Sequence, residues 1–313
     1  MDVISWLMDS DPAIRWQVTR DLSDAPPKAV TAERARVAGH GWGARLLALQ
    51  ADDGQWGGGL YSPKWISTTY TLLLLRHLGV DPKSSPVQAA RDRLVEGGVV
   101  WRGGSLGSSG SGFFEYLGET CVTGMNLALG CYFGAGETNT ARVVEWSLDE
   151  QLDDGGWNCE SHNGSVRSSF HTTISMLEAL LEYERSGRAP RLAAQSAAAR
   201  ARAHAYLLDR HLHRSLTTGE SISPSWNRFS FPPRWWFDVL RGLDYLRDAE
   251  VAVDDRWGEA LELLERKRTK DGRWKLQNHH SGREHFRMEN PGEPSRWNTL
   301  RALRVQRWVA SSQ

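Results

Sequence analysis

The chain has 313 residues, 40% of them hydrophobic, which is enough for one large domain or two small ones. Its 38 Lys and Arg residues balance 38 Asp and Glu residues, so its charge favours neither nucleic acid nor an anionic membrane as a partner. Three cysteines cannot form a disulfide framework, which favours a reducing, cytoplasmic location. The longest apolar run, four leucines at 72–75, is too short for a transmembrane segment.

Helix-like segments recur in pairs along the chain. A first copy occupies 11–22, and the first helices of later pairs are predicted at 42–50, 89–97, 143–152, 201–212 and 259–268. The second helices are predicted to begin near residues 15, 65, 121, 171, 234 and 296. A period of this length, built from helical hairpins, is typical of a solenoid or a closed toroid. We find no convincing run of alternating strands.

The loops between paired helices carry a motif, Asp-Gly-x-Trp. Three copies are clear, at 53–56, 154–157 and 271–274. Glycine suits a tight turn, aspartate bonds nearby backbone, and tryptophan wedges between helices. We therefore interpret the motif as structural and do not assign a catalytic role to its aspartates.

The first and last copies resemble each other, because both combine arginine and tryptophan in an apolar helix pattern. Like ends can meet and close a ring, whereas open solenoids usually need polar caps. The sequence therefore predicts an all-α fold, an (α/α)6 toroid formed by residues 1–313 as a single domain. The second helix of each pair is expected on the inside.

In such a ring the starts of the inner helices gather at one mouth. Four of them carry a cation beside tryptophan, and the other two carry Cys121 and His171. Cys121 and His171 are residue types that ligate zinc, which needs about four ligands. Cys159, in the loop before the His171 helix, can supply a third, and Glu119 is a fourth candidate. The alternative is that these residues are ordinary packing, as we expect for Cys131.

The Asp-Gly-x-Trp repeats resemble those of the squalene–hopene cyclase and protein prenyltransferase superfamily, whose fold is an α/α toroid. The tail at 294–308 also resembles bacterial single-toroid proteins known as prenyltransferase or squalene-cyclase repeat proteins. In the prenyltransferases zinc is held by Asp-x-Cys and by a histidine that opens a later inner helix. Glu119-x-Cys121 and His171-Thr172 match this pattern, except that glutamate replaces aspartate and Cys159 is additional.

The resemblance also implies that basic side chains at the rim hold a diphosphate and that an aromatic wall holds an isoprenoid. The expected substrate-binding residues are the cations Lys64, Arg234 and Arg296 and the tryptophans Trp65, Trp235, Trp236 and Trp297. The family's second subunit is not part of this chain, so a small-molecule substrate is favoured over a protein tail.

Three functions follow as expectations. The first is a zinc-dependent enzyme that activates a thiol or another nucleophile for alkyl or prenyl transfer or for cyclisation. The second is a terpene cyclase, although the Asp-x-Asp-Asp acid motif is absent and only Asp-Asp pairs occur. The third is a toroid that binds an apolar ligand without catalysis.

Overall fold

The computed structural model describes residues 2–97, 100–102, 105–107 and 119–312. These residues form a largely helical protein, which confirms the all-α prediction. The α-helices are α1 (Val3–Met8), α2 (Pro12–Asp21), α3 (Pro27–Ala35), α4 (Gly41–Leu47), α5 (Thr68–Leu78), α6 (Ser85–Gly97), α7 (Thr120–Tyr132), α8 (Glu137–Asp149), α9 (Phe170–Arg185), α10 (Pro190–Leu208), α11 (Val239–Asp248), α12 (Gly258–Arg266) and α13 (Arg296–Ser311).

Strands are short wherever the structure describes the backbone. The pair β1 (Val100–Arg102) and β2 (Ser105–Gly107) is antiparallel, as is the pair β3 (Trp274–Lys275) and β4 (Pro294–Ser295). Short 3₁₀ helices lie at Arg36–Ala38, Ser161–Asn163, Pro224–Asn227 and Asp255–Trp257. Within the described ranges, no helix combines the length and apolar character needed to cross a membrane.

The Asp-Gly-x-Trp motif has the same geometry in all three copies. Its tryptophans are fully buried, and each indole N–H donates to a carbonyl ten residues earlier, at 2.7–2.8 Å. Each tryptophan backbone N–H donates to a threonine hydroxyl at 3.0–3.1 Å, the threonines being Thr68, Thr173 and Thr299. The motif glycines have φ of +83°, +95° and +73°, which glycine adopts without strain. The structural interpretation is confirmed for the glycines and tryptophans of the motif.

Helix starts follow local capping signals. The Asp11 side chain accepts from the N–H of Ala13 at the start of α2, and Pro12 fills the first turn, where its missing N–H costs nothing. Asp238 and Ser295 cap α11 and α13 in the same way. Cys121 and His171 lie in the first turns of α7 and α9, as predicted. Lys64 and Arg234 do not open helices, however: they lie in the loops before α5 and α11.

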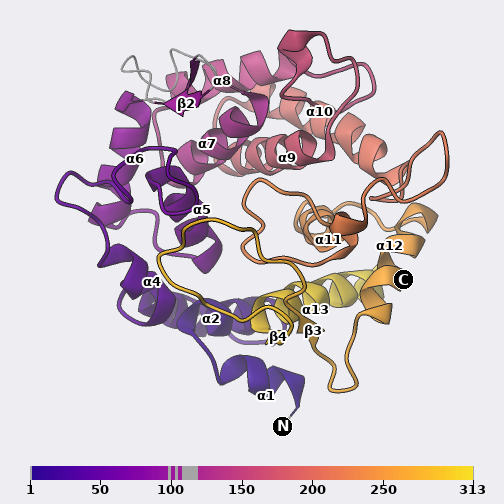
Figure 1. Cartoon of the computed structure of the whole chain (residues 1–313). Helices are drawn as coiled ribbons and strands as arrows, with labels where there is room; N and C mark the ends of the chain where they lie inside the picture. Colours follow the sequence, from indigo (N-terminus) through magenta and orange to yellow (C-terminus); the bar gives the residue numbers. More distant parts are fainter. Residues whose placement is uncertain (1, 98–99, 103–104, 108–118, 313) are drawn as a thin grey trace.

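Six helices, one from each predicted repeat, line a common central cavity: α2, α5, α7, α9, α11 and α13. Figure 1 shows these helices around the middle of the molecule, with α13 lying beside both α2 and α11. The first and last copies therefore meet. The loop from 276 to 293, between β3 and β4, crosses in front of the inner helices in this view.

Candidate metal centre

Three of the four predicted zinc ligands lie together. One ligand atom from each of Glu119, Cys121 and Cys159 lies within 4.8 Å of the others, and the described residues contain no further group of this kind. Glu119 is the N-cap residue of α7 and Cys121 lies in its first turn. Cys159 follows the buried Trp157 and reaches back over the start of α7. We call these three residues the metal group.

Hydrogen bonds fix the position of Cys159. Its Sγ accepts the backbone N–H of Cys121 at 3.1 Å and lies 3.3 Å from the Thr172 hydroxyl. The side-chain amide of Asn158 donates to the Arg167 carbonyl at 2.6 Å and closes the loop beneath it. The sulfur is therefore held at the amino end of α7, where the helix dipole favours a thiolate.

The two sulfurs share their protons unequally. The interaction between the two sulfurs lowers the pKa of Cys159 against the opposing effect of burial, and Thr172 and the Cys121 N–H lower it further. The same interaction, together with burial, raises the pKa of Cys121. Burial also raises the pKa of Glu119, while the Lys64 ammonium group opposes this rise. Cys159 is therefore the first of the two thiols to ionise.

The donor set suits zinc. Two thiolates and one carboxylate are typical zinc ligands, and three protein ligands with an open fourth position are typical of catalytic sites. With zinc–sulfur distances of about 2.3 Å, ligand atoms around a tetrahedral ion stand roughly 3.5–4 Å apart. The spacing within the metal group, at most 4.8 Å, comes close to this separation.

His171, the fourth predicted ligand, does not belong to this group. Its Nδ1 accepts the backbone N–H of Phe237 at 2.8 Å, so the ring points toward the loop before α11. Its edge contacts Trp226, Trp235 and Trp236, with ring centroids 5.2–5.6 Å apart. Burial, reinforced by the positive charge of Arg241, lowers its pKa to about 4, so the ring is neutral. The structure therefore gathers the Glu-x-Cys pair with Cys159 and leaves histidine in an aromatic cluster.

Several predicted substrate residues surround that cluster. Trp235 and Trp236 stack on each other with ring centroids 3.8 Å apart, and His280 stacks on Trp236 at 5.4 Å. The exposed Lys64 places its ammonium group 5.7 Å from the Trp65 ring and 5.8 Å from the Trp235 ring. A cation and three of the four predicted wall tryptophans are thus close neighbours.

Arg234 is less available than predicted. Its side chain is only 7% exposed, lies over the Trp65 ring and is 3.7 Å from the Glu284 carboxylate. Burial lowers its pKa to about 10, although Glu284 opposes this. Arg234 is charged at neutral pH and already has a partial partner.

Arg296 and Trp297 belong to a different environment. The Arg296 guanidinium donates to the Asp9 carbonyl at 3.0 Å and lies over the Trp6 ring, so it packs against α1. Trp297 is buried and stacks on Phe231 with ring centroids 4.1 Å apart. Arg296 therefore contacts a different part of the structure from Lys64 and Arg234.

Sequence reasoning missed the part played by the loop at 276–293. The backbones of Lys64 and Arg283 bond each other at 3.2 Å, and the Trp65 indole donates to the Ser281 carbonyl at 2.9 Å. His279 lies 2.7 Å from Glu284. The three closely spaced histidines at 279–285 were the sequence feature that could have indicated a role for this loop. In the structure the loop covers the aromatic cluster.

Comparisons with known proteins identify no family. No protein-family model and no curated protein matches the chain. One solved structure, described as the crystal structure of a protein from Actinoplanes, is 18% identical and aligns over 96% of this chain and 90% of its own, with a TM-score of 0.45.

Proposed function

We propose that the chain is an (α/α)6 toroid that binds one zinc ion through Glu119, Cys121 and Cys159 and uses it as the reactive centre of a transferase. The proposed reaction is alkyl or prenyl transfer to a thiol or similar nucleophile. The observation that carries the proposal is the metal group itself: two thiols and a carboxylate with ligand atoms within 4.8 Å. The three free cysteines further support a cytoplasmic location.

A zinc ion bound here would lower the pKa of a bound thiol and present it as an anion. The chain's own residues supply the surroundings. The Cys121 N–H and the Thr172 hydroxyl hold Cys159 in place. The indoles of Trp235 and Trp236 offer an apolar wall, and Lys64 offers a cation near Glu119.

In the proposed transfer to a thiol, a sulfur–carbon bond forms while the bond between carbon and diphosphate oxygen breaks. Diphosphate leaves with the bonding electron pair, and the thiol proton passes to solvent water before attack. The loop at 276–293 covers the Trp235–Trp236 wall through His280, which keeps water from the apolar part of a substrate.

The central cavity does not favour the alternative of an apolar-ligand carrier. Apolar ligands need walls dominated by hydrophobic side chains with few polar groups. Here the described lining includes many charged side chains, among them Arg241, Asp244 and Arg301.

Elemental analysis of protein purified without chelators tests the metal proposal. We expect about one zinc ion per chain in the wild type and in the Cys131→Ala control, because Cys131 is a buried core residue. Cys121→Ala and Cys159→Ala should lose zinc, and Glu119→Gln should weaken zinc affinity at least tenfold. Wild-type protein that contains no zinc and binds none on titration would sink the proposal.

His171→Gln separates this ligand set from the one that the family resemblance implies. If Glu119 is the third ligand, the His171 variant keeps its zinc. If His171→Gln loses zinc and Glu119→Gln does not, the ligand set proposed here is wrong. The transfer itself is tested by mass spectrometry for a thioether product after incubation with a small thiol and an isoprenyl diphosphate. Cys159→Ala serves as the inactive control.

A further inference from the structure

The inner helices, together with Arg34 of α3, line a partly open cavity of about 260 Å³ that lies away from the metal group. Its lining extends from the middle of the helices toward the carboxyl ends of α5, α7 and α9. Along α7, Cys121 and the lining residue Tyr132 are separated by eleven residues, which corresponds to about 16 Å. The cavity and the metal group are therefore separate places in the fold.

The cavity carries an excess of positive charge. Among the described residues, its lining contains eight arginines and four carboxylates. Asp21, which is not part of the lining, forms an ion pair with Arg304. Counting Asp21, three more positive than negative charges converge on this space. The arginines are Arg20, Arg34, Arg76, Arg185, Arg241, Arg247, Arg301 and Arg304; the carboxylates are Glu178, Glu182, Asp244 and Asp248.

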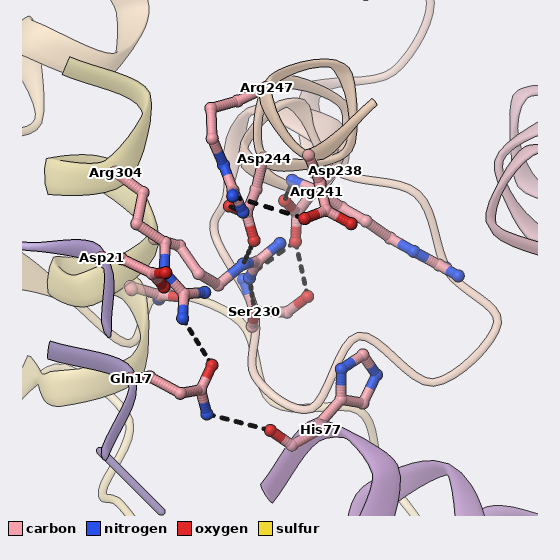
Figure 2. Close-up of polar contacts among 12 residues, drawn as sticks. Gln17, Asp21, His77, Ser230, Asp238, Arg241, Asp244, Arg247 and Arg304 are labelled. Carbon is pink, nitrogen blue, oxygen red and sulfur yellow. Dashed lines mark hydrogen bonds and ion pairs between the residues drawn. The ribbon is translucent and has the colours of Figure 1, made fainter. Parts of the chain in front are cut away.

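Some of these carboxylates are shared between arginines. Asp244 lies 2.7 Å from Arg247 and 3.4 Å from Arg301, so one negative charge serves two cations. Figure 2 shows Asp244 and Arg247 of α11 beside Arg304 of α13, which reaches Asp21 and Gln17 of α2. A shared carboxylate leaves part of each guanidinium charge uncompensated.

Three further side chains lack a partner expected of them. Arg34 donates to the Gly79 carbonyl at 2.9 Å and to the Tyr132 hydroxyl at 2.8 Å, and it forms no ion pair with a carboxylate in the described structure. Within the same residues, the Nε of Arg247 and the indole N–H of Trp297 are buried without a hydrogen-bond acceptor. Donors buried without acceptors are costly, and Arg247 and Trp297 both line the cavity.

Helix dipoles do not account for this charge. Cations stabilise helix carboxyl ends, which explains arginines such as Arg76 near the end of α5. Arg301 and Arg304, however, lie within the second and third turns of α13, far from its carboxyl end. Their side chains are each 7% exposed, and burial lowers the pKa of Arg304, so their charges are held at an energetic cost.

We propose that this cavity binds a small molecule through a phosphate or diphosphate group. Guanidinium groups bind phosphate oxygens in bidentate fashion, and a charge of −2 to −3 would offset the excess. At about 260 Å³ the cavity is slightly smaller than most ligand pockets, so the ligand is small. The site is independent of the zinc proposal and of the rim residues Lys64 and Arg234.

Calorimetric titration with inorganic diphosphate tests the site. Arg34→Gln and Arg301→Gln are suitable variants, because Arg34 has no carboxylate partner and Asp244 keeps Arg247 when Arg301 is removed. The exposed Arg266, whose ion-pair partner among the described residues is Glu262 at 3.6 Å, provides the matched control Arg266→Gln. We expect saturable binding in the wild type, at least tenfold weaker binding to the cavity in each cavity variant and unchanged binding in the control.

Two further arms locate and identify the ligand group. Lys64→Gln and Cys159→Ala should bind diphosphate like the wild type, which separates this site from the rim and from the metal group. Malonate, a dicarboxylate, should bind at least tenfold more weakly than diphosphate. Circular dichroism and urea unfolding establish that each variant is folded before titration.

The inference is overturned by any of three results. These are no saturable binding to the wild type, equal binding in folded Arg34 and Arg301 variants, or loss of binding only in the Lys64 variant. Tighter binding of malonate than of diphosphate would overturn the assignment to phosphate. If the wild-type protein binds no zinc but still binds diphosphate in the cavity, the proposed function is wrong and this inference stands.

Discussion

Two half-buried histidines should make the protein sensitive to mild acid. His77 lines the central cavity, and burial together with the neighbouring Arg76 lowers its pKa to about 3. His204 lies 3.0 Å from the Tyr245 hydroxyl, and burial together with Arg200 lowers its pKa to about 3 as well. Both rings stay neutral in the folded protein over most of the acid range.

The sign and size of the effect follow from proton linkage. An unfolded histidine titrates near pH 6.5, so below that pH the unfolded chain takes up protons that the folded chain refuses. Stability is therefore complete above about pH 6.5 and falls as the pH decreases toward 3. Between pH 7.5 and 5.0 each histidine costs about 2 kcal/mol, at 1.36 kcal/mol per pH unit. The two together remove about 4 kcal/mol, a large share of the usual 5–15 kcal/mol.

Urea unfolding at pH 7.5 and at pH 5.0, followed by circular dichroism, measures this loss. The variant His77→Gln/His204→Gln removes both titrating groups, so its loss of unfolding free energy should be about 4 kcal/mol smaller than that of the wild type. His40→Gln changes an exposed histidine and should behave like the wild type. If the double variant and the wild type lose the same stability within 1 kcal/mol, the reasoning is refuted.

Two further changes test the packing of the helices by urea unfolding. Trp157→Phe should lower the free energy of unfolding by about 2–4 kcal/mol, because it leaves the Ser147 carbonyl without its donor and opens a void. The control Trp146→Phe changes a part-buried tryptophan and should cost under about 1 kcal/mol. Equal costs in the two variants would contradict this reasoning. Glu178→Gln should cost about 3–5 kcal/mol, because Arg241 loses its charge partner and one of the two bonds of its pair at 2.8 Å. This variant also adds positive charge to the cavity, so unchanged or weaker diphosphate binding would count against the anion site.

Features set by local sequence could be predicted. The turn of Asp-Gly-x-Trp requires only a glycine with positive φ and a tryptophan that reaches a carbonyl ten residues back, and all copies form it. The starts of α7 and α9 were also correct, since apolar spacing defines them. Cys159 lies close to Cys121 because the turn of the motif directs the residues that follow Trp157 toward the start of α7.

Features set by distant contacts could not be predicted. Lys64 and Trp65 were expected to open a helix, but their backbones pair with Arg283, more than two hundred residues later. His171 was expected to ligate metal, but a backbone N–H from the loop before α11 occupies its Nδ1. No local pattern shows which loop will lie over a helix start.

The clustering of arginines around the cavity could not be predicted for a related reason. On a single helix, Arg76 or Arg301 looks like an ordinary surface charge, and only closure of the helices around one space brings such residues together. Local periodicity identifies which face of a helix points inward. The net charge of the cavity, however, depends on the residues that all the other repeats place there.

Comparison of the repeats with one another shows which positions pack the helices together and which determine the charge of the cavity. Thr173 and Thr299 play the same part, since each accepts the backbone N–H of its motif tryptophan. Five residues after them stand Glu178 and Arg304, in the same register and both lining the cavity, but with opposite charge. Packing alone would accept the same residue at both positions, and an apolar one would fill the space without the cost of burying charge. The repeats are alike where they pack and differ where they face the cavity, which is the distribution expected if the cavity binds a charged ligand in one orientation.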